Sequence, residues 1–415
     1  MAAANTSADL AAVYRDLHAH PELAFRETRT AAIVADRLRT LGYETTTGVG
    51  RTGVVGVLRN GDGPTALLRA DMDALPVQEQ TGLPYASTLQ GTDSDGTTVP
   101  LMHACGHDMH VTCLLGAAAE LAADRSAWQG TVLLVFQPAE EIAGGARAMV
   151  DDGLYERFGR PDVVLGQHVA PLPAGFIGLR PGPAFAASDS LSVVLHGQGG
   201  HGSRPEATVD PVLMAAATVM RLHGIVSREI AGSSTAVLTV GALHAGTRGN
   251  IIPDRAELHL SVRTFDPMVR ENVMAAIERI VRAEAAASAA PREPDITLTE
   301  SFPAVINDPD ACARTQEAFA AGLGPDLVVD PGPVTGSEDV GILATKADAP
   351  CVYWLLGGAD PQAFAPARTL EEVAHIAHSL PSNHSPHYAP VIEPTLTTGI
   401  KALVHAAHAW MPAQT

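Results

Sequence analysis

An amphipathic segment opens the regular part of the chain. Residues 28–44 (TRTAAIVADRLRTLGYE) bring apolar side chains such as Ile33, Val34 and Leu38 onto one face at helical spacing. Gly42 stands where such a helix would end. This pattern predicts a surface helix with one face buried against a core.

Short apolar runs of strand length follow this helix. They do not alternate with polar residues, which is typical of strands that are buried on both faces of a largely parallel sheet. A helical segment, GGARAMVDDGLY, separates two of them. The runs are residues 54–58, 66–70, 131–136, 163–169 and 351–356.

The pattern changes between residues 185 and 301. The order there is strand, helix, strand, strand, helix, strand, and residues 257–262 alternate between polar and apolar, as in a sheet with one solvated face. We therefore predict an α/β fold. A first domain with a largely parallel mixed sheet flanked by helices comprises residues 1–184 and 302–415, and an α+β domain of ferredoxin-like β-α-β-β-α-β order is inserted at 185–301.

Acidic and imidazole side chains stand at the ends of three predicted strands. Asp71 and Asp73 follow the run at 66–70, and Glu140 and Glu141 follow the run at 131–136. His168 lies at the end of the run at 163–169. Because ligands of open α/β sheets gather at the carboxyl ends of strands, these groups are expected to share one edge of the sheet.

The segment LMHACGHDMH (101–110) adds a thiol and several imidazoles. Cys105 and His107 are one residue apart, and His384 lies in the loop SNHSPHYAP near the other end of the chain. Each residue alone has an ordinary interpretation. The cysteine could be a small buried residue, a histidine could have its ring nitrogens hydrogen-bonded within the protein, and the two glutamates could be a solvated pair. Together they are donors for a transition metal, and a thiolate favours zinc or another borderline ion over magnesium or calcium.

Composition narrows the class of protein. The 415 residues carry 27 Lys and Arg against 46 Asp and Glu, a net charge of −19, which argues against nucleic acid or an anionic membrane as partner. The four cysteines are too few for a disulfide framework and indicate a reducing, cytoplasmic setting. The start of the chain does not resemble a secretory leader, and no apolar stretch is long enough to span a membrane.

The chain resembles metal-dependent amidohydrolases along nearly its whole length. The branch it resembles contains hippurate hydrolases, N-acyl-amino-acid amidohydrolases and indole-acetyl-amino-acid hydrolases, within the aminoacylase and carboxypeptidase group of di-metal peptidases. HACGHD followed downstream by PAEE is the most specific part of the resemblance. In order, its motifs are RDLHAHPELAFRET, LLRADMDALPVQE, MHACGHDMH, VFQPAEE, GQHVAPLPAG, GQGGHGSRP, GTRGNIIPD, GSEDVG and NHSPHY.

The resemblance implies a site for two divalent metal ions per subunit, with zinc, manganese, cobalt and nickel all open. In this family Cys105 would bridge the two ions. The implied ligands are Cys105, His107, Glu141, His168 and His384.

The resemblance also implies catalytic and substrate-binding residues. Glu140 matches the general base, and His201 of the inserted domain matches a histidine that polarises the scissile carbonyl, often in the neighbouring subunit. Asn250 and Arg263 match residues that face the substrate, and Arg263 or backbone amides near Gly336 would receive a carboxylate. An ion pair within the inserted sheet is the alternative for Arg263.

Other acidic and imidazole residues of these motifs are expected to support the ligands. Asp71 and Asp73 stand where other branches carry a ligand histidine, so we assign them, with Asp108, to the surroundings of the ligands. His103 and His110 are expected to be supporting or structural.

The expected activity is hydrolysis of the amide bond of N-acyl amino acids by metal-activated water with a glutamate base. The small-molecule substrate would be the main partner, and the inserted domain would act as a lid and form a homodimer or higher oligomer. An N-acetyl-diaminopimelate-type deacetylase, a dipeptidase or a carboxypeptidase is the alternative within this chemistry. A non-catalytic metal-binding or thiol redox protein, or a carrier of acyl amino acids, is the alternative outside it.

Overall fold

A computed structural model describes residues 7–413, apart from the side chains of Ser7 and Leu370. It divides the chain into two compact units. Unit 1 is the described part of Met1–Ala184, Ile306–Gly332 and Asp339–Thr415, and unit 2 is Phe185–Val305 with Pro333–Glu338. Residues 1–6, on which part of the leader-peptide interpretation rests, lie outside the described residues. Within the described part, no helix combines the length and apolarity needed to cross a bilayer.

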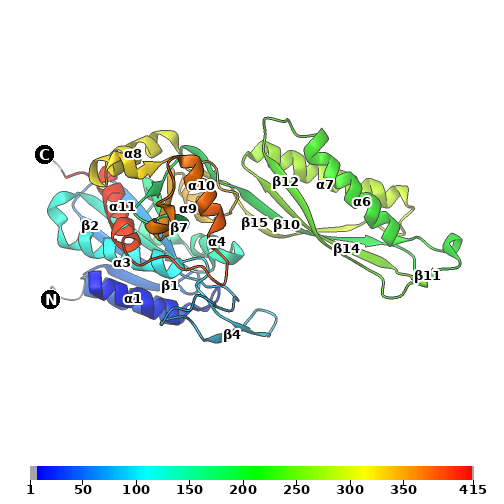
Figure 1. Ribbon diagram of the computed structural model, residues 1–415, viewed down its shortest axis with the longest axis horizontal. Helices are drawn as coiled ribbons and strands as arrows, with labels where there is room; N and C mark the ends of the chain where they lie inside the picture. Colours follow the sequence, from blue (N-terminus) through cyan, green and yellow to red (C-terminus); the bar gives the residue numbers. More distant parts are fainter. Residues whose placement is uncertain (1–6, 414–415) are drawn as a thin grey trace. The chain divides into compact units, whose positions relative to one another are not determined.

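Unit 1 is built on an eight-stranded mixed sheet of order β1-β2-β6-β3-β7-β18-β8-β17 (Figure 1). The four central strands β6, β3, β7 and β18 are parallel, whereas β1, β2 and β8 join antiparallel neighbours. The strands are β1 (Glu44–Val49), β2 (Gly53–Asn60), β3 (Thr65–Asp71), β6 (Gly130–Gln137), β7 (Val163–Pro173), β8 (Ile177–Gly178), β17 (Val328–Val329) and β18 (Cys351–Ala359).

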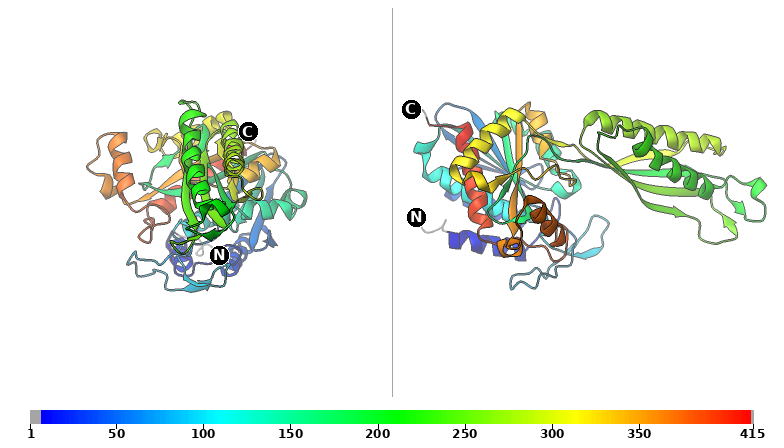
Figure 2. Two further views of the ribbon diagram at one scale, coloured as in Figure 1. Left: turned by 90° about the vertical axis from the view of Figure 1, so that its right-hand side faces the viewer. Right: turned by 45° about the horizontal axis from the view of Figure 1, so that its top comes forward.

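The central strands are buried on both faces because two groups of helices cover them. Helix α3 packs against α1, α2 and α11, and α11 packs against α8; α11 and α8 lie side by side in both figures (Figures 1 and 2). A second group, in which α4 packs against α9 and α5, also contacts the sheet through β6 and β7. The helices are α1 (Ser7–Ala19), α2 (Thr28–Thr40), α3 (His107–Ala123), α4 (Gly145–Asp151), α5 (Leu154–Phe158), α8 (Pro309–Gly322), α9 (Val340–Ala347), α10 (Leu370–Ser379) and α11 (Thr395–Trp410).

Helix α3 is buried on almost every side, from His107 to Leu121, with Glu120 exposed. It lies inside the main core of unit 1, which it shares with apolar residues of β3, β6, β7 and β18. Its first turn carries the polar residues His107, Asp108 and His110, all buried. A polar helix start in such a core requires internal partners for each polar group.

Unit 2 has the predicted β-α-β-β-α-β order. Its antiparallel sheet runs β12-β14-β10-β15, and helices α6 and α7 lie side by side over one face of it (Figures 1 and 2). Alternate residues of β14 are buried and more exposed, which confirms the single solvated face. The elements are β10 (Ala187–His196), α6 (Pro211–Arg228), β12 (Ala236–Ala245), β14 (Arg255–Thr264), α7 (Pro267–Ala287) and β15 (Asp295–Phe302).

Shorter elements complete both units. They are β4 (Gln90–Thr92), β5 (Thr98–Pro100), β9 (Gly182–Phe185), β11 (Gly200–His201), β13 (Ile251–Ile252) and β16 (Val305–Asn307).

The predicted fold class is confirmed: a mixed, mostly parallel sheet flanked by helices, with an inserted α+β unit. The predicted helix between the strands at 131–136 and 163–169 is two short helices, α4 and α5, because Gly153 adopts a left-handed conformation between them (φ 81°).

Candidate metal centre

Three neighbouring strands deliver polar groups to one edge of the unit 1 sheet. Asp71 ends β3 and is in register with Gln137, which ends β6. A short turn after β6 carries Glu140 and Glu141, and His168 lies on β7, next to β3. The structure therefore brings together side chains that are up to about a hundred residues apart, because parallel strands end on the same side.

The start of α3 comes to the same edge through a tight turn. Gly106 has a left-handed conformation (φ 82°), and a Cβ atom there would lie 2.4 Å from Cγ1 of Val169. Only glycine fits both constraints without strain in this turn or a shift of the Val169 side chain. This turn joins Cys105 to His107, so that both side chains face His168 and the glutamates.

The five predicted ligands lie together in two overlapping groups. Cys105, His107 and His168 form one group, and Cys105, Glu141 and His384 form the other; within each group the ligand atoms are within 4.8 Å of one another. Cys105 Sγ lies 3.5 Å from His168 Nε2. Cys105 is the residue common to both groups, as a bridging ligand would be.

The donors fit a cation because several of them are buried without a hydrogen bond. Within the described residues, neither ring nitrogen of His107 nor Oε1 of Glu141 has a hydrogen-bond partner. His107 Nε2 faces Glu141 Oε1 at 3.8 Å, and His384 Nε2 faces the other oxygen of Glu141 at 3.4 Å. Buried polar atoms in this state are costly unless something else pairs with them, and a divalent ion is a suitable partner for this donor set.

The electrostatics of the cluster also favour a cation. Burial raises the pKa of the Cys105 thiol well above its usual range, and the carboxylates of Glu141 and Glu140 raise it further. Burial lowers the pKa of His107, but the carboxylates of Asp71 and Asp73 outweigh this and raise it to about 10. A divalent ion would take the place of these protons, since metal ligands must be deprotonated.

The loop near the end of the chain binds the backbone beside two of the candidate ligands, Cys105 and His168. His168 donates a hydrogen bond from Nδ1 to the carbonyl of Val169 (2.9 Å), which leaves Nε2 directed at Cys105. The amide of Asn383 donates to the carbonyls of both Cys105 and Val169, each at 3.1 Å. Sequence reasoning missed Asn383, although it directly precedes His384.

The structure places Asp71 and Asp73 around the ligands. Asp73 Oδ1 lies 3.3 Å from His107 Nδ1, and its Oδ2 accepts from the backbone N–H of Glu141 (3.0 Å). Asp71 accepts from His110 Nδ1, while His110 Nε2 accepts from the N–H of Val169. Asp71, His107 and His110 are close enough to hold an ion themselves, but both nitrogens of His110 are already used in these hydrogen bonds.

A family model for peptidase family M20/M25/M40 matches residues 67–381 of the chain. The chain belongs to this family. The matched region contains the candidate ligands Cys105, His107, Glu141 and His168, and ends just before His384. The predicted enzyme class, a hydrolase of peptide or amide bonds, is thereby confirmed.

Two proteins of similar sequence and one solved structure match most of this chain. A hippurate hydrolase of Campylobacter jejuni is 40% identical over 349 residues, 83% of this chain and 86% of its own length. The thermostable carboxypeptidase 1 of Saccharolobus solfataricus is 37% identical over 350 residues, 83% of this chain and 84% of its own. The solved structure of the YXEP protein of Bacillus subtilis, described as a dinuclear metal binding peptidase, is 30% identical with a TM-score of 0.76, and covers 97% of both chains.

A buried arginine organises the carboxyl edge of the sheet in this M20 chain. Arg69 on β3 is 1% exposed and donates to Gln137, to Asp71 (2.6 Å) and to Asp339 (3.0 Å). Burial raises the pKa of Asp71, but Arg69 and the neighbouring histidines outweigh it and hold that pKa well below its usual range. A charged residue inside an apolar run is a signal that sequence reasoning could have used, because a buried arginine needs acidic partners.

Asp108, the residue after His107, is held by a buried histidine. His18 of α1 contacts Asp108 Oδ2 at 2.6 Å with Nδ1 and Glu79 Oε1 at 3.0 Å with Nε2, and the facing side-chain atoms are fully buried. Burial lowers the pKa of His18, but Asp108 and Glu79 outweigh this and raise it to about 10. The imidazolium therefore ties α1 to the start of α3, a role that sequence reasoning did not assign to His18.

This arrangement predicts a pH-dependent loss of stability. The folded pKa of His18 exceeds that of an unfolded histidine, so its contribution is complete below about pH 6.5 and is lost as the pH rises through about 10. His18→Gln should lower the free energy of unfolding at pH 6 by about 1–3 kcal/mol, because one buried carboxylate loses its partner. Urea denaturation at pH 6 and pH 10 measures this difference.

The matched control is His20→Gln, two residues away. The ring of His20 is 42% exposed and bonds to the carbonyl of Asp16, so its replacement should change the free energy of unfolding by less than about 0.5 kcal/mol. A stability difference between wild type and His18→Gln that is the same at both pH values would contradict the charged state of His18.

The remaining predicted residues belong to unit 2. His201 lies on β11, which pairs with β13, so its backbone adjoins that of Asn250. His201 Nδ1 accepts from the N–H and hydroxyl of Ser203, which leaves the proton of the neutral ring on Nε2. Arg263 donates to the carbonyl of Thr335 and the hydroxyl of Ser337, and so lies beside the segment that contains Gly336. Both of these contacts are hydrogen bonds to uncharged groups.

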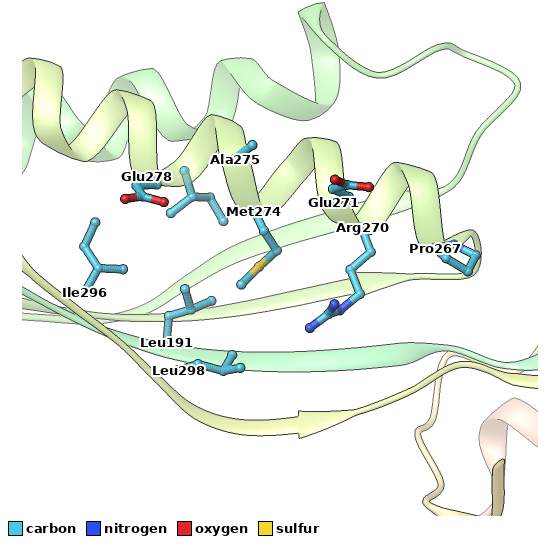
Figure 3. A pocket seen from close by; sticks show the side chains of 10 residues that line it. Leu191, Pro267, Arg270, Glu271, Met274, Ala275, Glu278, Ile296 and Leu298 are labelled. Carbon is cyan, nitrogen blue, oxygen red and sulfur yellow. The ribbon is translucent and has the colours of Figure 1, made fainter. Parts of the chain in front are cut away.

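A hollow between α7 and the sheet of unit 2 is a different feature from the metal centre. Figure 3 shows Arg270 reaching toward the sheet beside apolar side chains, and Arg270 pairs there with Asp189 at 2.6 Å. The lining lacks the thiol and imidazole groups of the cluster in unit 1. It consists of Leu191, Pro267, Arg270, Glu271, Met274, Ala275, Ile277, Glu278, Ile296 and Leu298.

Proposed function

We propose that the chain hydrolyses the amide bond of N-acyl amino acids, with Glu140 as general base beside a pair of divalent cations. The observation that carries the proposal is the position of Glu140, a carboxylate 4% exposed, directly before a candidate ligand and 4.0 Å from another, His107. A protein that only stored metal would gain nothing from a buried carboxylate beside its ligands.

Cys105, His107, Glu141, His168 and His384 would hold the two cations. When bound, the cations would polarise the scissile carbonyl and lower the pKa of the attacking water. Thiolate and imidazole donors favour zinc, cobalt or nickel over calcium, and manganese is the fourth ion that the family resemblance leaves open. The resemblance of the chain to a solved dinuclear metal binding peptidase supports two ions in place of one.

Glu140 takes one proton from water as the new C–O bond forms, and delivers it to the amine nitrogen as the C–N bond breaks. The immediate products are a carboxylic acid and the amine of the free amino acid, and the proton left on the acid then passes to this amine or to solvent, which gives the carboxylate. Such a base contributes about 10²–10⁴-fold to the rate. The Nε2–H of His201 would donate to the oxyanion that develops on the carbonyl, and Arg263 with the segment around Gly336 would receive the carboxylate of the amino acid.

The proposal extends to the compartment in which the enzyme acts and to its assembly. All four cysteines lie within the described residues, where they are buried and form no disulfide with one another, which supports a reducing cytoplasm. Unit 2 would act as a lid that brings His201 to the substrate and as the surface through which a homodimer or higher homo-oligomer forms. Light scattering of the purified protein measures this assembly.

A carboxypeptidase is the second candidate. It is favoured by the 37% identity to a thermostable carboxypeptidase over 83% of this chain. Both reactions cleave an amide next to a free carboxylate, so the same arginine and the same base would serve either one. The two candidates differ in what lies on the acyl side of the amide: a simple acyl group or a peptide.

A substrate panel separates the candidates. We expect the metal-loaded enzyme to hydrolyse hippurate or another N-acyl amino acid with a kcat/KM at least about tenfold above that for dipeptides and blocked peptides. The panel should contain hippurate, N-acetyl amino acids, indole-acetyl amino acids, N-acetyl-diaminopimelate, dipeptides and a benzyloxycarbonyl dipeptide. Release of the free amino acid is the readout.

The control is the methyl ester of the preferred substrate, which lacks the carboxylate. Its kcat/KM should fall by about 10²-fold if a cationic group receives the carboxylate. If the enzyme prefers peptides to N-acyl amino acids, the carboxypeptidase function replaces the first candidate. Hydrolysis of no substrate in the panel by the metal-loaded enzyme would refute both.

A further inference from the structure

Glu27, at the start of α2, has a buried carboxylate that the proposed reaction does not use. The residue is 0% exposed, and it lies at the N-cap position of α2 without capping the helix through its side chain. Glu22 performs that task, since its two carboxylate oxygens accept from the N–H groups of Arg29 (2.9 Å) and Thr30 (2.8 Å). The side chain of Glu27 is therefore not explained by the helix to which it belongs.

The carboxylate of Glu27 instead reaches the turn that carries the two candidate glutamates. Its Oε1 accepts from the backbone N–H of Ala139 (2.9 Å), 112 residues along the chain, and from the N–H of Phe25 (2.9 Å). Its Oε2 accepts from the hydroxyl of Thr52. Three donors thus hold this carboxylate in one orientation, and one of them is the amide directly before Glu140.

The turn at Ala139 has a conformation that alanine rarely adopts. Ala139 is left-handed (φ 49°, ψ 44°) and fully buried, and its carbonyl accepts from the N–H groups of Gly144 and Gly145. A Cβ atom at Gly145 would lie 1.5 Å from the carbonyl oxygen of Pro138, so the turn closes tightly on itself. A non-glycine residue remains left-handed only where its surroundings impose that conformation.

A second carboxylate holds the other side of the same turn. Asp73 accepts from the N–H of Glu141 at 3.0 Å, as described above. The amides on both sides of Glu140 are therefore each bound by a buried carboxylate from another part of unit 1. Neither carboxylate needs to contact the substrate to determine where the side chain of Glu140 lies.

We propose that Glu27 is a positioning residue, which fixes the left-handed turn at Ala139 and thereby holds Glu140 in the orientation required for proton transfer. The proposal rests on the proposed function of Glu140. It assigns to the N-terminal segment, far from the metal ligands in sequence, a part in the geometry of the reaction.

Four variants test this proposal. Glu27→Ala should lower kcat by about 10–100-fold at saturating metal, because a displacement of about 1 Å at a catalytic group has an effect of this size. Its KM should change by less than about threefold, since the ligands and the substrate contacts remain. Glu27→Gln keeps an acceptor oxygen for the two amides, and its amide group can donate to Thr52, so it should retain most of the activity.

Glu22→Ala is the matched control. It removes the cap of the same helix and should lower the melting temperature, but it does not touch the turn and should leave kcat unchanged. Thr52→Val removes one of the three donors and should give a smaller loss of kcat in the same direction. This variant keeps the test decisive if Glu27→Ala does not fold.

Hydrogen exchange measured by mass spectrometry provides a readout that does not depend on turnover. Amides of residues 138–145 should exchange faster in Glu27→Ala than in wild type or Glu22→Ala, while metal content stays constant. An inactive wild type would refute the proposed function but leave this comparison intact. Unchanged kcat in an active Glu27→Ala enzyme, or exchange in the turn equal to that of Glu22→Ala, would overturn the role of Glu27.

Discussion

Glu140→Gln should lower kcat by about 10²–10⁴-fold without a change in metal content, because glutamine has the shape of glutamate but cannot accept the proton of the attacking water. Glu140 is absent from both donor groups that contain Cys105; in a third group, with His107 and Glu141, it lies 4.0 Å from His107, and a glutamine would keep a side-chain oxygen there. The ions should therefore remain bound when its charge is removed. Steady-state kinetics together with metal quantification on the same sample measure both quantities.

The adjacent glutamate provides the control. Glu141 faces His107 at 3.8 Å and His384 at 3.4 Å, so Glu141→Gln should lower the metal content first and lose activity as a consequence. Excess metal should restore part of the activity of Glu141→Gln but none of that of Glu140→Gln. Normal turnover in Glu140→Gln, or metal loss from it equal to that from Glu141→Gln, would refute the role of Glu140 as the base.

The part of the site that lies at strand ends could be predicted from the sequence. Runs that are apolar on both faces predict central parallel strands, and the polar residues that follow them must then lie on one edge of the sheet. Asp71, Glu140 and His168 were predicted to meet on this reasoning, and the structure brings them to neighbouring strands. Motif resemblance added His384, whose loop has no periodicity from which its position follows.

The supporting contacts could not be predicted, because each depends on a pairing between distant segments. His18 meets Asp108 across 90 residues, and Glu27 meets Ala139 across 112. Nothing in the local sequence distinguishes a buried glutamate such as Glu27 from one that caps a helix, as Glu22 does. The left-handed backbone conformation at Ala139 (φ 49°) is similarly imposed by tertiary contacts, since alanine does not favour it.

The contacts of Arg69 could be predicted only in part from the sequence. It interrupts an apolar run in β3, and such a residue must be paired when the strand is buried. The sequence therefore indicates that partners exist, but not that they are Asp71, Gln137 and Asp339. Only Asp71 is near it in sequence, and the contact to Asp339 spans 270 residues.

Cys105→Ala should have the largest effect on the metal centre. Because Cys105 is the residue shared by both donor groups, its loss should weaken the binding of both ions, by more than the roughly 10–100-fold that is typical when a partner of a metal ligand is removed. Metal content after dialysis should fall well below that of wild type, and turnover should fall with it. The matched control is Cys113→Ala, since Cys113 is fully buried in the core of the same unit and belongs to neither group.

The alkylation rate of the Cys105 thiol also measures directly whether the ions are bound. With metal bound, alkylation of Cys105 should be slow at every pH, because the residue is only 7% exposed and its sulfur would be coordinated. After chelation, the pKa of Cys105 should lie above its usual range, raised by burial and by the nearby carboxylates, so the rate should increase steadily as the pH rises past 9. The reaction requires the thiolate, and the chelated site supplies it only at high pH. Equal alkylation of Cys105 with and without chelator, or wild-type metal content in Cys105→Ala, would show that the sulfur is not a ligand, and the two ions would then lack the donor that links them.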